Sequence, residues 1–128
     1  MGEVFVERSS KYWLDDDGII HGVLFRDADF QMADAESMMA LHRRMTGGKA
    51  ACLLMDVTAM KSMPREVRAY FQRPEHAEVH KAVAMIVGSP LSRAIGNFFL
   101  GLNKPVMPMR LFSDEESALP WLRTHRSR

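Results

Sequence analysis

The sequence predicts an α/β fold: a small mixed, mostly parallel sheet with an N-terminal β-hairpin and four helices that alternate with the strands. Two stretches, residues 50–55 and 82–87, are apolar at every position, which is typical of parallel strands covered on both faces. Segments in which apolar residues recur at helical spacing lie between and after these stretches. Two β-prone runs joined by an Asp-Gly turn precede them, and they predict the hairpin.

The hairpin is predicted from residues 12–14 and 19–25, which are separated by the sequence DDDG at 15–18. Its glycine supplies the positive φ that a tight turn needs. We expect a solvated turn here rather than a Ca²⁺ site, because no glutamate follows at the spacing of an EF-hand loop. Residues 4–6 either begin the first strand or add an edge strand.

The first helix is predicted over residues 32–45, where apolar side chains recur at spacings of three and four. Acidic residues lie near its start and basic residues near its end, which complements the helix dipole. Gly47 and Gly48 end it, since glycine adopts the left-handed cap conformation without steric cost.

A second helix is predicted over residues 65–72, with Pro64 in its first turn and Ser62 or a neighbour as its cap. Pro74 breaks this helix, and a short helical turn follows over 75–80. His76 and His80 have the i, i+4 spacing at which two imidazoles can reach one zinc ion. Because no third ligand is set by spacing, we expect both histidines on an exposed helical face.

The third helix begins after Gly88, with Ser89 as cap and Pro90 at the first position. Its apolar face comprises Leu91, Ile95, Phe98, Phe99 and Leu102, and residues 103–105 end it. Ser89, Ser92, Gly96 and Leu100 form a narrow strip beside that face. A glycine inside a helix indicates close approach of a neighbour, which we expect to be the protein's own sheet rather than a second copy.

A short strand is predicted over residues 109–112, and the last helix follows it. Ser113 and Glu116 have the spacing of a capping box. The buried stripe of this helix comprises Ala118, Trp121 and Leu122. Pro120 is expected to kink or shorten its first turns.

The 128 residues predict one domain spanning 1–128, and a formal charge of +1 argues against nucleic-acid binding. The basic tail, residues 123–128, is expected to be a frayed end. The single cysteine, Cys52, lies within an apolar run and indicates a buried thiol in a reducing, cytoplasmic setting. No apolar stretch is long enough to span a membrane. Eleven methionines suit either the core or an adaptable binding surface, and we favour the core.

No glycine-rich phosphate loop and no Gly-x-Ser-x-Gly nucleophile motif occurs in the sequence. Cys52 lies in the middle of a predicted strand, where a substrate would not reach it. We therefore expect no enzyme activity, no catalytic residues, no cofactor and no bound metal.

The candidate ligand site follows from the topology. In open α/β sheets, ligands bind beyond the carboxyl ends of the parallel strands, where helix N-termini offer unpaired amides. Lys61 and Arg93 could hold an anion between them, but we favour the alternative, in which the serines only cap helices and the cations are solvated. Asp56 and Ser113 belong to the same edge, and Asn97 lies one turn beyond Arg93. The candidate ligand-binding residues are Thr58, Lys61, Ser62, Ser89, Ser92, Arg93 and Asn97.

The element order resembles the STAS domain, or SpoIIAA-like, fold over nearly the whole chain. Residues 61–70, 89–100 and 112–122 are similar to a family of short, functionally uncharacterised bacterial STAS-like proteins. The resemblance implies a non-catalytic regulatory or protein-interaction module that binds a protein partner or a second copy of itself. The alternative is a binder of a small anionic or apolar, lipid-like ligand at the carboxyl ends of the parallel strands.

The chain departs from STAS regulators at one position that matters for regulation. Those proteins place a phosphate-accepting serine in a turn after the strand that corresponds to residues 53–56. The comparable stretch here, residues 63–66, reads MPRE, and Ser62 is the nearest serine. We therefore expect Ser62 to have a structural role near the start of the helix rather than to accept phosphate.

Overall fold

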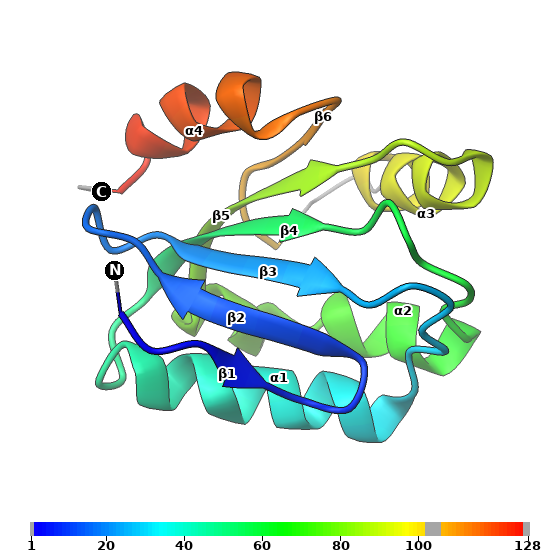
Figure 1. The fold of residues 1–128 in the computed structure, drawn as a ribbon, viewed down its shortest axis with the longest axis horizontal. Helices are drawn as coiled ribbons and strands as arrows, with labels where there is room; N and C mark the ends of the chain where they lie inside the picture. Colours follow the sequence, from blue (N-terminus) through cyan, green and yellow to red (C-terminus); the bar gives the residue numbers. More distant parts are fainter. Residues whose placement is uncertain (1, 102–105, 127–128) are drawn as a thin grey trace.

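A computed structural model describes residues 2–101 and 106–126 (Figure 1). Within these ranges the secondary structure follows the predicted order closely. The elements are β1 (Phe5–Val6), β2 (Ser10–Leu14), β3 (Ile20–Leu24), α1 (Met32–Met45), β4 (Ala51–Asp56), α2 (Arg65–Phe71), the 3-10 helix η1 (Pro74–Glu78), β5 (His80–Ile86), α3 (Pro90–Leu100), β6 (Met109–Phe112) and α4 (Glu115–Arg123).

The strands form one mixed sheet whose spatial order, β1 to β6, is the order of the chain. β1, β2 and β3 are antiparallel, and β3, β4, β5 and β6 are parallel. The two apolar stretches pair side by side, with Leu53 opposite Val83 and Met55 opposite Met85. The predicted fold class is confirmed, and residues 5–6 form an edge strand.

Helices cover both faces of the sheet, but unequally. Right-handed crossovers between consecutive parallel strands place their helices on one face, and α1, α2 and α3 lie on that face (Figure 1). α4 follows the last strand and lies on the opposite face (Figure 1). Side chains alternate across each strand, so Leu53 and Met55 join the larger core cluster while Cys52 and Leu54 pack beneath α4.

The hairpin turn is more than a solvated loop. Gly18 has the expected positive φ of 80°. Asp17, however, accepts from Arg123 of α4 at 3.0 Å and pairs with Arg126 just beyond it at 2.6 Å. These contacts lower the pKa of the Asp17 carboxyl, through hydrogen bonds from Arg126 first and then from Arg123. The turn therefore holds the end of α4, and the tail as far as Arg126 is attached rather than frayed.

Several predicted helix ends differ from the structure. α4 begins at Glu115, so Asp114 rather than Ser113 is its cap and accepts from the Ser117 amide at 2.8 Å. α4 also continues through Pro120. α2 is preceded by Pro64 and has no side-chain cap, so Ser62 does not cap it. The predicted end of the third helix, Leu102 and residues 103–105, lies outside the described residues.

The predicted helical turn at 75–80 is present in shorter form, but the prediction that its two histidines are exposed is wrong. Pro74 starts the short helix η1, which ends at Glu78, and His80 begins β5. Both His76 and His80 are therefore buried, with 3% and 4% of their surface exposed. The apolar face of α3 is partly wrong as well: Ile95 and Phe99 are buried, whereas Leu91 and Phe98 are about 40% exposed.

Two glycines permit close packing within the sheet layers. A Cβ at Gly96 would lie 2.6 Å from a Leu111 methyl group, so the neighbour of this helical glycine is the protein's own β6. A Cβ at Gly22 of β3 would lie 2.5 Å from Met55 Sδ and 2.7 Å from the ring of Tyr12. The Tyr12 ring is fully buried, so it has little room to move away.

We therefore predict that Gly22→Ala destabilises the protein by about 1–3 kcal/mol, the usual effect of adding volume to a packed core. Urea denaturation of the purified variant measures the change. Gly2→Ala is the control, since nothing lies within 4 Å of a Cβ at Gly2. If Gly22→Ala matches the control, the packing of Tyr12 against β3 is looser than the structure indicates.

Candidate functional site

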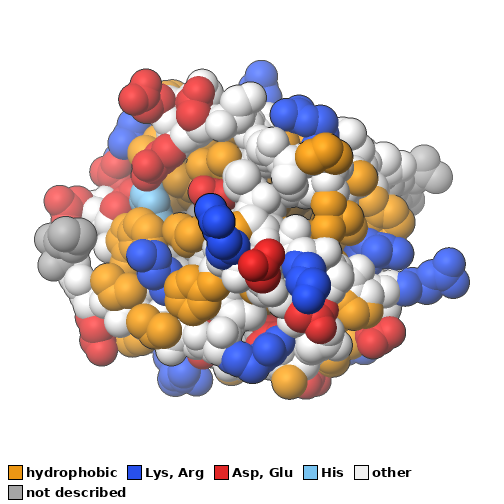
Figure 2. Space-filling model, turned by 45° about the vertical axis from the view of Figure 1, so that its right-hand side comes forward, with side chains coloured by type: hydrophobic (Ala, Val, Ile, Leu, Met, Phe, Trp, Pro, Cys, Tyr) orange, Lys and Arg blue, Asp and Glu red, His pale blue; other side chains and the backbone are white. Residues whose placement is uncertain are grey.

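The predicted residues at the carboxyl ends of the strands do not converge on one site. Thr58 and Ser89 line the same wide, shallow hollow, together with Asp27 and Leu91. Lys61, Arg93 and Asn97 are exposed and do not line that hollow in the part of the chain that is described. On the face shown in Figure 2, basic and acidic side chains are mixed on the right-hand side, whereas acidic side chains predominate at the upper left.

Two of the predicted serines hold the start of α3. The Ser92 hydroxyl accepts from the backbone amides of Gly88 and Ser89 at 3.1 and 3.0 Å. Ser89 Oγ accepts from the Ser92 amide at 3.0 Å, which completes a reciprocal cap. Ser92 is fully buried. These hydroxyls are already paired, so they are structural caps.

Ser62 has a structural partner too. Its hydroxyl donates to the carboxylate of Asp29, and the same two residues form an isolated parallel bridge. This contact joins the loop after β4 to the loop after β3. The expectation that Ser62 has a structural role therefore agrees with its contacts.

The structure contains a deeper cavity that sequence reasoning missed. It lies on the side of the sheet that α1, α2 and α3 cover, and it is partly open to solvent. Its volume of about 90 Å³ is several times what one water molecule needs. Six of the chain's eleven methionines line it. The lining consists of Phe30, Met38, Leu53, Met55, Val57, Met63, Phe71, His76, His80, Val83, Met85, Phe99, Val106, Met107 and Met109.

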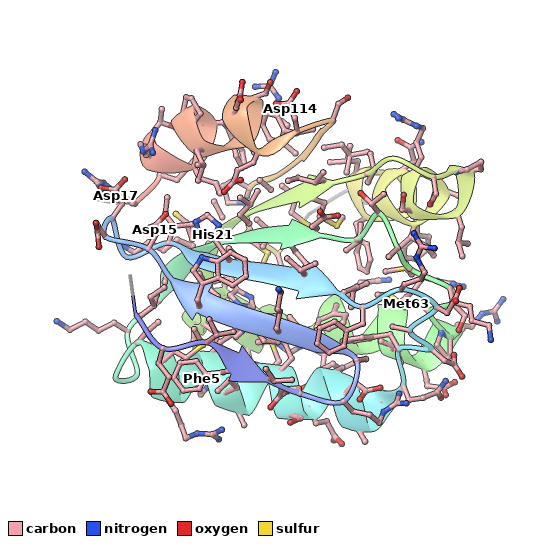
Figure 3. All side chains as sticks on the ribbon, in the orientation of Figure 1. Phe5, Asp15, Asp17, His21, Met63 and Asp114 are labelled. Carbon is pink, nitrogen blue, oxygen red and sulfur yellow. The ribbon has the colours of Figure 1, made fainter. Side chains whose placement is uncertain are left out.

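The methionine excess was the sequence signal for this cavity. The favoured interpretation, that the methionines belong to the core, agrees with the structure, and six of them also face the open space of the cavity. Met63, labelled in Figure 3, comes from the loop after β4, and Met109 begins β6. Flexible thioethers fill irregular gaps and adapt to ligands of different shape.

Buried histidines lie beside the cavity. His42 Nδ1 is 2.8 Å from His80 Nε2, and the Tyr12 ring packs edge-on against His42 at 4.5 Å between centroids. Burial lowers the pKa of His42 to about 3 and that of His80 well below its ordinary value. Both rings are therefore neutral at pH 7, and one donates a hydrogen bond to the other.

The third buried histidine has an unpaired nitrogen. His76 Nε2 lies 2.6 Å from the carbonyl oxygen of Tyr70, so Nε2 carries the proton and donates. Its Nδ1 is buried and has no partner within the described residues. Burial also lowers the pKa of His76. His76 lines the cavity, as does His80.

A second, smaller hollow lies on the α4 face, lined by residues that include Trp13, His21 and Glu115. His21 Nε2 is 2.8 Å from Asp15 Oδ2, and its Nδ1 is 3.3 Å from Glu115 Oε1. Figure 3 shows Asp15 and His21 close together at the hairpin end of the sheet. The imidazole thus joins the hairpin to the start of α4, and both of its nitrogens are engaged.

The mixed sheet, with three helices on one face and α4 on the other, is an α/β fold of the SpoIIAA-like type. The family described as "Domain of unknown function (DUF7793)" matches residues 12–126, and the chain belongs to that family. Within the described residues, no helix is long and apolar enough to cross a membrane.

Two crystal structures are similar to this chain. One is an uncharacterised protein of the DUF3478 family with a SpoIIAA-like fold from Shewanella loihica PV-4, with a TM-score of 0.58, 22% identity, and coverage of 94% of this chain and 92% of that chain. It supports the assignment of the fold. The other is a protein with unknown function from Arthrobacter sp. FB24, with a TM-score of 0.34, 34% identity, and coverage of 88% and 92%. No curated protein matches the chain significantly.

The buried histidines predict a specific loss of stability in weak acid. In the unfolded chain they bind protons near pH 6.5, whereas in the folded chain they stay neutral, so the unfolded state binds more protons below that value. The free energy of unfolding should fall between pH 6.5 and 4.5, by roughly 1.4 kcal/mol per pH unit for each such histidine. The carboxyls of Asp17 and Asp34 have lowered pKa values and contribute only below about 4.

Urea denaturation at pH 7.0, 5.5 and 4.5 measures this dependence. The double variant His42→Leu/His80→Leu should flatten it, because the pair is removed together and no buried partner is left unpaired. His125→Gln, near the end of the chain, should keep the slope of the wild type. An unchanged slope in the double variant would show that the pair is not the source of the acid sensitivity.

Proposed function

We propose that this protein is a non-catalytic binding module whose ligand is a small, mainly apolar molecule held in the methionine-lined cavity. The cavity itself is the observation that carries the proposal. Protein interiors are close-packed and leave few voids larger than a water molecule. Ligand sites, in contrast, are concave and mostly apolar with a few polar groups, which describes this lining.

The contacts of the predicted polar residues support ligand binding over catalysis. The serines at the strand ends are paired within the protein, and His21 has carboxylates at both nitrogens. Cys52 is buried, its Sγ donates weakly to the Leu122 carbonyl at 3.5 Å, and burial raises the pKa of its thiol. A buried, reduced thiol also favours a cytoplasmic location.

Filling the cavity tests the proposal. Propylbenzene is the probe, and the wild type should bind it and unfold at a higher temperature in its presence, because binding to the folded state alone stabilises that state. Val83→Phe places a ring in the lining and should abolish the shift. Val23→Phe is the matched control, since Val23 lies on the opposite face, in the smaller hollow.

Differential scanning calorimetry provides the measurement. The proposal fails if the wild type shows no propylbenzene-dependent shift, or if Val83→Phe retains the shift in full while remaining folded. Loss of the shift in Val23→Phe as well would place the binding elsewhere on the molecule.

A protein-interaction role is the second candidate function, as the resemblance implied. The observation that favours it is a set of large apolar side chains exposed on α3, namely Leu91, Phe98 and Leu100, each about 40% exposed. A second copy of the chain is the simplest partner. Light scattering should then report a dimer that Phe98→Ser converts to a monomer; a wild type that is already monomeric at high concentration would argue against this role.

A further inference from the structure

We infer that His21 is a pH-sensitive tie between the hairpin turn and the start of α4. The ring holds the first turn of the helix when it carries two protons and releases that turn when it carries one. The inference goes beyond the proposed function, because it concerns the α4 face of the sheet and not the cavity. It follows from the position of two carboxylates around one buried ring.

Each ring nitrogen of His21 lies next to a carboxylate of a different element. Nε2 is 2.8 Å from Asp15 Oδ2 in the hairpin turn (Figure 3), and Nδ1 is 3.3 Å from Glu115 Oε1 in the first turn of α4. Only 8% of the His21 side chain is exposed. The ring of Trp13 stacks on it with 5.2 Å between centroids. The stacking holds the plane of the imidazole, so each nitrogen faces its own carboxylate.

Only a doubly protonated ring can donate to both carboxylates. A carboxylate accepts hydrogen bonds and does not donate them, and a neutral imidazole has a single N–H group. The neutral ring therefore turns a lone pair toward one of its two partners. Asp15 is fixed in place, because its Oδ1 accepts from the amides of Asp17 and Ile19 at 2.8 and 3.0 Å. The longer contact, with the half-exposed Glu115, is the one that is lost.

The other neighbours of the ring leave His21 as the group that changes charge. From β4, Leu54 is opposite His21 in register and Asp56 lines the same small hollow. From β2, Trp13 stacks on the ring, and Lys11 Nζ lies 5.9 Å from the centre of the indole. Among these side-chain types, only histidine ordinarily changes its charge between about pH 5 and 8. The contact with Glu115 is therefore made at the acid end of this range.

The far end of α4 is held by contacts that do not depend on pH in this range. Asp17 pairs with Arg123 at 3.0 Å and with Arg126 at 2.6 Å. A guanidinium group keeps its charge at every pH at which the protein is folded. Loss of the second proton from His21 therefore acts on the start of the helix and leaves its end attached.

The first turns of α4 cover apolar surface of the sheet. Ala118 lies three residues after Glu115, is fully buried, and belongs to the same cluster as Leu54 and Ala84. A looser first turn exposes part of this surface, so the cover of the α4 face decreases as the pH rises. The sign is opposite to that of the buried histidine pair on the other face, which destabilises the fold in weak acid.

Amide hydrogen exchange of the whole protein at pH 6.0 and 8.0 tests the inference. In an α-helix the amide of Leu119 donates to the carbonyl of Glu115, so its protection reports on the first turn. After correction for the intrinsic exchange rate, this protection should fall about threefold from pH 6.0 to 8.0, the size of effect that one partly exposed ion pair provides. Protection of the Arg123 amide, at the attached end, should change little.

Two variants locate the effect. Glu115→Gln removes the charge that the ring holds and should abolish the pH dependence at Leu119. Glu116→Gln is the matched control, because it removes the other acidic residue of the first turn and changes the helix dipole equally. His125→Gln removes a histidine just beyond the end of α4. Both controls should retain the threefold change.

The remaining outcomes contradict the inference. Equal protection of Leu119 at the two pH values in the wild type would overturn it, as would a pH dependence that persists in Glu115→Gln. Loss of the dependence in His125→Gln would assign it to the wrong ring. Equal changes at Leu119 and Arg123 would show that the whole helix opens, and that His21 does not act on its start alone.

Discussion

The structure depends on one constraint: β4 and β5 are apolar on both faces and must be covered on both. Cys52 and Leu54 face one side while Leu53 and Met55 face the other, and every one of them is buried. A single layer of helices would leave half of these side chains in water. The segment after β6 therefore returns over this face as α4, and the hairpin holds it in place through Asp17 and His21.

The unequal cover of the two faces decides where open space remains. On the α4 face, small residues such as Ala82, Ala84 and Ala118 allow the helix to lie directly on the sheet. On the other face, three helices meet over four parallel strands, and long flexible side chains fill the junction incompletely. The methionines therefore gather where the geometry is least regular, which is also where His76 and His80 enter the core.

The sequence predicted the fold well, because buried strands, helix periodicity and the glycines that end helices can each be recognised from a few neighbouring residues. The candidate functional site was harder to predict from the sequence than the fold. Ser89 and Ser92 were correctly placed at a helix start, but whether a cap hydroxyl is free depends on its partners. The exposure of the histidines was mispredicted because the turn ends at Glu78, which leaves His80 in β5, and because His76 packs against the rings of Tyr70 and Phe71. The cavity arises only from packing between distant segments, which no local pattern records.

The cavity bears on the stability of the fold as well as on the proposed binding. The side chains that line the cavity lack packing partners on that side, which lowers the stability of the core. A ligand present at a hundred times its Kd returns about 2.7 kcal/mol. A bound ligand would therefore restore part of the contacts that the open space removes. Under the proposed function, the stability of the fold would therefore rise with the concentration of the ligand.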